Sequence, residues 1–171
     1  NGDIYVKLTF NDAMNGAGGT VGLRDTNQDG KADTIAYFGD YKDEGSLAVG
    51  VTIHNGYLYT STVKQVLRNK LSPGKLVPDS KTEVVLTDED ENVVKNWHTT
   101  KPLGFDNKGN MYVPFGSPND ACQNMNKFGP TGIPNGRGLD PCPDLEHHAG
   151  IWRFDAKKTG LTQKDGYKFA T

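Results

Sequence analysis

Residues 25–33 form a short segment rich in oxygen ligands, D-T-N-Q-D-G-K-A-D. Its side-chain ligands are Asp25, Asn27, Asp29 and Asp33. Oxygen atoms at alternate positions can wrap a hard cation such as Ca²⁺, and Gly30 permits the sharp turn that keeps them converging. We expect a structural calcium site here, with the Lys31 carbonyl as a further ligand. Ala36 occupies the position of the bidentate Glu of an EF-hand, so a metal-free acidic hairpin is the alternative.

The four histidines are candidates for acid–base chemistry, because imidazole titrates near neutral pH. His98 lies just before the apolar-rich run 101–105, which we expect to form an inner strand whose leading loop borders a ligand cleft. A histidine placed there can accept a proton from a bound hydroxyl. The alternative is that His98 hydrogen-bonds its own loop. For His147 and His148 we expect loop packing or exposure, and for His54 an exposed hairpin turn.

Cys122 and Cys142 both lie in the Gly/Pro/Asn-rich stretch 116–150, which has neither a strand nor a helix period. A disulfide closing this loop would contribute about 3 kcal/mol under the chain-entropy model, and it would place the protein in the periplasm or outside the cell. Two unrelated buried thiols are the alternative. A zinc site with His147 and His148 lacks the usual close spacing of ligands.

A recurring pattern indicates how these residues are positioned. Residues 1–6 return as 55–60 and again as 108–113, each copy with a turn glycine followed by alternating residues typical of a hairpin leading into a strand. Further strands are expected downstream of each copy, at 22–24 and 34–38, at 66–68 and 82–87, and at 151–153 and 167–170. Four strands per unit at a period of about 50 residues are typical of β-propeller blades.

We therefore predict an all-β fold, a β-propeller fragment of about three four-stranded blades within the single domain 1–171. The units are approximately 1–44, 45–97 and 98–171, and the first lacks its innermost strand, so the chain makes about half of a six-bladed ring. A half-ring exposes apolar blade faces, so we expect a longer parent chain or pairing with a second copy. The net charge of −2 excludes a broad basic nucleic-acid surface, and no apolar run approaches the roughly 20 residues of a membrane span.

The run 98–116, H-T-T-K-P-L-G-F-D-N-K-G-N-M-Y-V-P-F-G, resembles the soluble quinoprotein glucose dehydrogenase and L-sorbosone dehydrogenase family. Its members carry a similar H-x-x-x-x-L-x-F-x-x-x-G-x-[LIM]-Y-[VF] segment, and residues 50–60 look like the family's G-L-A-F-x-x-G-x-L-Y-V. The resemblance covers most of residues 20–171. It implies a six-bladed propeller that oxidises sugar hydroxyls or lactols with pyrroloquinoline quinone (PQQ), held with calcium in the central cleft. It also implies that His98 takes the hydroxyl proton while hydride moves to the quinone.

This sequence departs from the family pattern at several positions. Trp97 and Ser117 stand where the glucose enzymes have acids, which leaves Asp120 as a candidate to orient His98. The sorbosone-like branch tolerates both changes and often carries cysteines in this loop, which fits Cys122. The family's cofactor-clamping Arg-Asn pair follows the strand that here ends at Thr171. We therefore expect the cofactor-binding residues beyond Thr171, and we expect the isolated chain not to hold PQQ.

The resemblance implies a sugar or polyol as substrate and a cytochrome or quinone as electron acceptor. The alternative function is a non-catalytic calcium-binding propeller used for binding or scaffolding, since fold resemblance alone does not establish catalysis. An integrin-like form of that alternative would carry one calcium loop per blade, and the second and third units have none.

Overall fold

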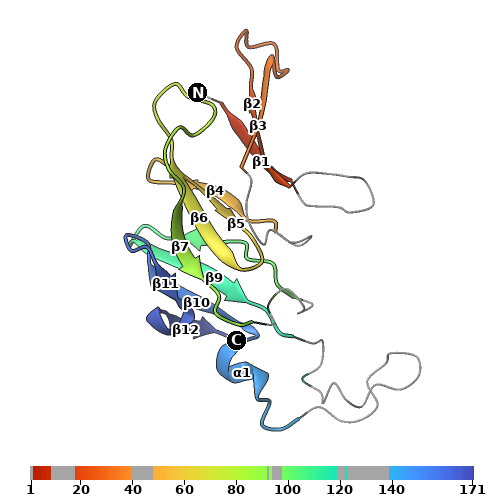
Figure 1. Ribbon diagram of the computed structural model, residues 1–171, viewed down its shortest axis with the longest axis vertical. Helices are drawn as coiled ribbons and strands as arrows, with labels where there is room; N and C mark the ends of the chain where they lie inside the picture. The colour runs from red at the N-terminus through yellow and green to blue at the C-terminus, as the bar shows by residue number, and fades with distance from the viewer. Residues whose placement is uncertain are drawn as a thin grey trace, which may run out of the picture.

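The computed structural model describes residues 2–8, 18–39, 48–91, 93, 98–118, 122 and 139–171. These residues form three β-sheets that follow one another along the long axis of the molecule (Figure 1). The first sheet contains β1 (Ile4–Leu8), β2 (Gly19–Arg24) and β3 (Thr34–Phe38). The second contains β4 (Val51–His54), β5 (Tyr57–Ser61), β6 (Gln65–Lys70) and β7 (Glu83–Thr87). The third contains β8 (Gly104–Phe105), β9 (Asn110–Phe115), β10 (Gly150–Asp155) and β12 (Tyr167–Ala170).

Helix is confined to short turns in the described residues, which include α1 (Asp144–His147) and a 3₁₀ turn at Gln163–Asp165. Within each sheet the strands listed above pair antiparallel in chain order, and the first sheet has one strand fewer than the third. The predicted all-β propeller fragment with an incomplete first blade is therefore confirmed. The unit boundaries at 44/45 and 97/98 fall on or beside residues that the structure does not describe, so they stay a prediction.

The hairpin between β4 and β5 shows why the repeated glycine motif forms strands. His54 pairs with Tyr57, so the connection is the two-residue turn Asn55-Gly56. Both turn residues have positive φ, 48° and 76°, which Asn and Gly adopt more readily than other residues. The turn twist matches the twist of the flanking strands, and it fixes which side chains of β5 face inward.

The main apolar core lies between the second and third sheets. Along β9 every second side chain is buried, as the alternation of a strand requires. These side chains are Met111, Val113 and Phe115, and they pack with Trp152 and Phe154 of β10 and with Val66, Val85 and Leu86 of the second sheet. Phe115 and Trp152 meet edge to face with ring centroids 5.1 Å apart, a favoured aromatic geometry.

A short strand that the repeat pattern did not predict ties these two sheets together. β11 (Leu161–Thr162) belongs to the segment between β10 and β12, yet it pairs in parallel with the outer edge of β7. The Gly160 N–H donates to the Val84 carbonyl at 2.9 Å, and Leu161 is buried in the shared core. The third unit therefore covers the edge strand of the second sheet, which protects its unpaired backbone groups.

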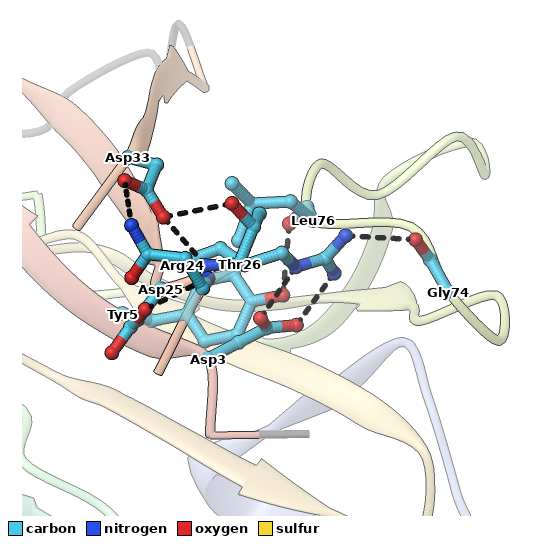
Figure 2. A network of polar contacts seen from close by, with 9 residues as sticks. Asp3, Tyr5, Arg24, Asp25, Thr26, Asp33, Gly74 and Leu76 are labelled. Carbon is cyan, nitrogen blue, oxygen red and sulfur yellow. Dashed lines mark hydrogen bonds and ion pairs between the residues drawn. The ribbon is translucent and has the colours of Figure 1, made fainter. Parts of the chain in front are cut away.

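Polar contacts join the first sheet to the loop between β6 and β7 (Figure 2). The Arg24 guanidinium donates to both carboxylate oxygens of Asp3 at 2.7 Å and to the Gly74 carbonyl at 3.0 Å. The Tyr5 hydroxyl donates to the Leu76 carbonyl at 2.8 Å. The hydrogen bond from Arg24 holds the pKa of Asp3 below its usual value, so the pair stays ionised at neutral pH.

Candidate functional site

The two candidate sites lie at opposite ends of the blades. The Asp88 N–H donates to the Lys64 carbonyl at 2.8 Å, at the start of β6, and the Asp88 carboxylate accepts from the ammonium of Lys101, three residues after His98. Arg24, which directly precedes the 25–33 loop, instead contacts Gly74, in the loop that follows the end of β6. A cation bound by residues 25–33 is therefore remote from the His98 imidazole.

His98 is exposed, and its ring is oriented by a backbone carbonyl. Nδ1 lies 3.0 Å from the Ser117 carbonyl oxygen. A carbonyl oxygen has no proton to give, so in the neutral ring this contact is a hydrogen bond only when Nδ1 carries the proton. Nε2 then holds the lone pair. The arrangement can accept a proton at Nε2 while the ring is held at Nδ1.

Gly116 explains how the two backbone segments come so close. A β-carbon at this position would lie 1.6 Å from the His98 carbonyl oxygen and 2.7 Å from the His98 β-carbon. Only glycine leaves room for this approach, which brings Ser117 next to the imidazole. The family-like motif ends at this glycine, and its steric role was not evident from the sequence.

The cysteine loop meets the same region through α1. Cys122 and Cys142 are joined by a disulfide, with their α-carbons 5.9 Å apart. The Ser117 hydroxyl donates to the Asp144 carboxylate at 3.3 Å, two residues after Cys142. The carboxylate and the two sulfur atoms lie within 4.8 Å of one another, but the sulfurs are bonded to each other and are not free thiolates for a metal.

The structure describes some of the other predicted site residues and leaves others undescribed. Asp120, the candidate orienting acid, lies outside the described residues, as does Trp97. His147 is the last residue of α1 rather than a loop residue, and it is largely exposed, as expected, with its ring 3.4 Å from the Glu146 carboxylate. His148 is more enclosed, with Nε2 3.9 Å from the Asp90 carboxylate.

Thr171 marks the position after which the cofactor-binding residues are expected. β12 ends at Ala170, as the predicted strand 167–170 does, and Thr171 is exposed and outside any strand. The reason is that backbone pairing with β10 stops at the Ile151–Ala170 pair. A quinone clamp beyond Thr171 concerns residues outside this sequence, so it stays a prediction.

The prediction that His54 is exposed in a hairpin turn was wrong. It is the last residue of β4, is partly buried, and stacks on the Phe105 ring with centroids 4.0 Å apart and planes 5° from parallel. The physical reason is that the inner strands β4 and β8 of adjacent sheets bring an imidazole and a phenyl ring face to face, which covers apolar surface on both.

The 25–33 loop is exposed and closed by its own hydrogen bonds. Asp25 accepts from the N–H groups of Gln28 at 2.6 Å and Gly30 at 2.8 Å. Asp33 accepts from both the N–H and the hydroxyl of Thr26 at 2.7 Å (Figure 2). The hydrogen bond from the Thr26 hydroxyl is the main reason that the pKa of Asp33 is lowered. The Asp33 carboxylate is therefore ionised at neutral pH, and carboxylate oxygens are the ligands that a hard cation prefers.

The remaining predicted ligands continue the same pattern. Asn27 accepts from the Asp29 N–H at 2.9 Å, and Asp29 accepts from the Lys31 N–H at 2.8 Å. Among the described residues, the one group of three metal-ligating side chains with atoms within 4.8 Å of one another is the cysteine–Asp144 group. The donor chemistry of the loop thus fits a hard cation, while its three carboxylates do not converge on one point.

Sequence reasoning missed a buried ion pair close to His98. Lys101 is 1% exposed, and its ammonium donates to the Asp88 carboxylate at 2.7 Å. The available signal was a lysine at the start of an apolar-rich strand together with an aspartate directly after β7. In the part of the chain that the structure describes, no helix is both long and apolar enough to cross a membrane.

No protein-family profile and no curated protein sequence matches this chain. Its fold matches an iodide structure and a calcium structure of Trichoderma reesei Carbohydrate-Active Enzymes Family AA12. Both show 16% identity and a TM-score of 0.61 over 98% of this chain, which covers 42% and 43% of theirs. The holo form of the pyranose dehydrogenase PQQ domain from Coprinopsis cinerea matches 98% of the chain at 14% identity and a TM-score of 0.58, with 41% of that chain covered. This chain thus spans about two fifths of the structures that it matches, and the likeness shows a propeller fold.

Proposed function

We propose that this chain forms one wall of the active site of a PQQ-dependent sugar or alcohol dehydrogenase, with His98 as the general base. One observation carries the proposal: an exposed imidazole just before the inner strand β8, with Nδ1 held by the Ser117 carbonyl, which places the acceptor lone pair on Nε2. The likeness in fold to the PQQ domain of pyranose dehydrogenase supports the choice of reaction class.

The hydrogen bond at Nδ1 fits the work of a base. When Nε2 accepts a proton from a sugar hydroxyl, the ring becomes a cation, and the Nδ1–H bond to the Ser117 carbonyl becomes charge-assisted and stronger. The contact therefore keeps the ring in one orientation while Nε2 receives the proton. PQQ, when bound, supplies the acceptor for the hydride.

We expect the residues that clamp an anionic quinone to lie beyond Thr171. Carboxylates of that kind suit a planar guanidinium, because it donates two parallel hydrogen bonds. The described arginines already have partners: Arg24 with Asp3, Arg68 with Glu83, and Arg153 with the face of the Tyr167 ring. We therefore assign no contact with the quinone to these residues.

The proposed reaction sets the class of substrate, which is an aldose, a polyol or a sorbosone-like aldehyde hydrate. The electrons pass to a cytochrome or quinone. The test uses the complete propeller that contains this segment, loaded with PQQ and Ca²⁺. Reduction of an artificial dye with an aldose or polyol is expected, and the separate segment 1–171 should show neither quinone binding nor turnover. A complete protein that binds no PQQ and reduces no dye would contradict the proposal.

We infer a second role, structural calcium binding, for the 25–33 loop. Its oxygen ligands, among them the ionised Asp33, and its position at the end of the blades remote from His98 favour a stabilising ion that takes no part in chemistry. Calorimetric titration of the 171-residue chain should show calcium-dependent heat and a rise in melting temperature, both lost in Asp29→Ala. If neither signal appears, the loop is a metal-free hairpin. A calcium signal in a protein without dehydrogenase activity would favour the non-catalytic propeller.

We also propose a periplasmic or extracellular location. The Cys122–Cys142 disulfide supports it, because such bonds persist mainly in oxidising compartments.

A further inference from the structure

We propose that the buried Lys101–Asp88 ion pair is a positioning device for the His98 imidazole. The side chains of Lys101 and Asp88 are 2% and 8% exposed, and the ammonium nitrogen lies 2.7 Å from the carboxylate oxygen. The proposal that the pair serves catalysis rests on the proposed function of His98. The proposal that the pair orients the ring does not need it.

Asp88 gives the pair a fixed end on the second sheet. It follows β7 directly, and its N–H donates to the Lys64 carbonyl at 2.8 Å, at the start of β6. Its second carboxylate oxygen accepts from the Asp90 N–H at 3.1 Å. Backbone contacts therefore hold Asp88 in place independently of its ion pair with Lys101.

Lys101 contacts both segments that hold the imidazole. It lies three residues after His98 on the same segment, and Thr99 between them is also buried. Its ammonium lies 4.8 Å from the centroid of the Phe115 ring, a cation–π contact. Phe115 directly precedes Gly116, the residue that packs against the His98 carbonyl. One cation thus links the second sheet, the His98 segment and the Gly116–Ser117 segment.

The energetics favour a role in orientation over a role in stability. Burying an ion pair costs a desolvation free energy that often cancels the attraction between the two charges. Apolar side chains of similar size commonly stabilise a core at least as much as a buried ion pair does. An ion pair differs from apolar packing because its hydrogen bond has a direction. Here the direction of the Lys101–Asp88 hydrogen bond fixes how the segment before β8 lies against the second sheet. Because His98 belongs to that segment, the pair also fixes the distance between the His98 ring and the Ser117 carbonyl.

The test reads the tautomer of His98 directly, by two-bond ¹H–¹⁵N correlation spectroscopy on the 171-residue chain with labelled histidine. The wild type should show the Nδ1–H tautomer, because Nδ1 donates to Ser117. The double variant Asp88→Asn with Lys101→Met removes both charges together and should lose this signature while the chain stays folded. Lys101→Arg, which keeps the charge, should retain it.

Two control variants separate positioning from general effects. Lys108→Met removes an exposed lysine at the far end of the β8–β9 hairpin, and Leu58→Ala opens a cavity in the second sheet at a side chain that is 1% exposed. Both should leave the His98 signature unchanged. The proposal is overturned if the folded double variant keeps the Nδ1–H tautomer, if Leu58→Ala loses it equally, or if Lys101→Arg loses it. A double variant that does not fold also overturns it, since the pair would then be needed for the fold itself.

The readout needs neither quinone nor substrate, so it is separate from the proposed function. If the tautomer changes as expected while His98→Gln leaves turnover of the complete protein intact, the positioning inference stands and the general-base role fails. If His98→Gln abolishes turnover while the double variant keeps the tautomer, the reverse holds.

Discussion

Replacing Gly116 with alanine should separate the two segments that hold His98. The added β-carbon would lie 1.6 Å from the His98 carbonyl oxygen, whereas ordinary contact begins at 3.4 Å, so the two atoms must move apart by about 1.8 Å. The obstacle is backbone, which cannot rotate away as the end of a side chain can. Overpacking of this kind costs about 1–3 kcal/mol, and we expect the upper end of that range.

The same strand pair offers a matched control. Gly104 in β8 has no heavy atom within 4 Å of a built β-carbon, so Gly104→Ala should be neutral or stabilising by about 0.5 kcal/mol. At about 2–4 °C per kcal/mol for a chain of this size, Gly116→Ala should lower the melting temperature by about 6–12 °C. Thermal unfolding followed by circular dichroism measures both variants. Equal melting temperatures for the two would refute the steric role assigned to Gly116.

Three further predictions concern stability. The Asn110 amide donates to the Asp106 carboxylate and holds the pKa of Asp106 well below its usual range. The Asp106 charge therefore stabilises the fold above about pH 4, and this contribution is lost as pH falls. Asp106→Asn should flatten the acid side of the plot of unfolding free energy against pH, measured by denaturant titration. Cys142→Ser should lower the free energy of unfolding by about 3 kcal/mol, and thiol counting in denaturant without reductant should find no free thiol in the wild type. Within the described part of the chain the buried Thr60 hydroxyl has no hydrogen-bond partner, so Thr60→Val should stabilise by about 1 kcal/mol in urea unfolding, and a loss of stability would contradict this.

The strands could be predicted because their signals are local. Turn glycines such as Gly56 and Gly109 repeat with the strands that follow them, and alternation along β9 marks which side chains are buried. β11 could not be found in this way, since it has only two residues and its partner β7 lies in another unit. Its pairing is decided by the packing of Leu161 in the shared core, a tertiary effect that local pattern does not report.

In the candidate site, too, the local features could be predicted from the sequence and the long-range contacts could not. Residue type and family-like spacing indicated His98, but the contacts that orient its ring come from distant parts of the chain. The Ser117 carbonyl contacts the His98 ring because Gly116 permits close approach of the two backbone segments. Lys101, just before the third sheet, pairs with Asp88, just after β7 of the second sheet. Such contacts depend on how the sheets dock, which a single sequence does not reveal.

The most direct test of the central claim is the turnover of the complete, PQQ-loaded and calcium-loaded propeller carrying His98→Gln. Glutamine keeps a polar side chain but cannot act as a base at neutral pH. We predict that kcat for dye reduction with an aldose falls by roughly 10²-fold or more, the usual scale for loss of a general base, while His54→Gln leaves it near the wild-type value. Wild-type turnover in His98→Gln would contradict the account and leave His98 as a loop residue held by Ser117.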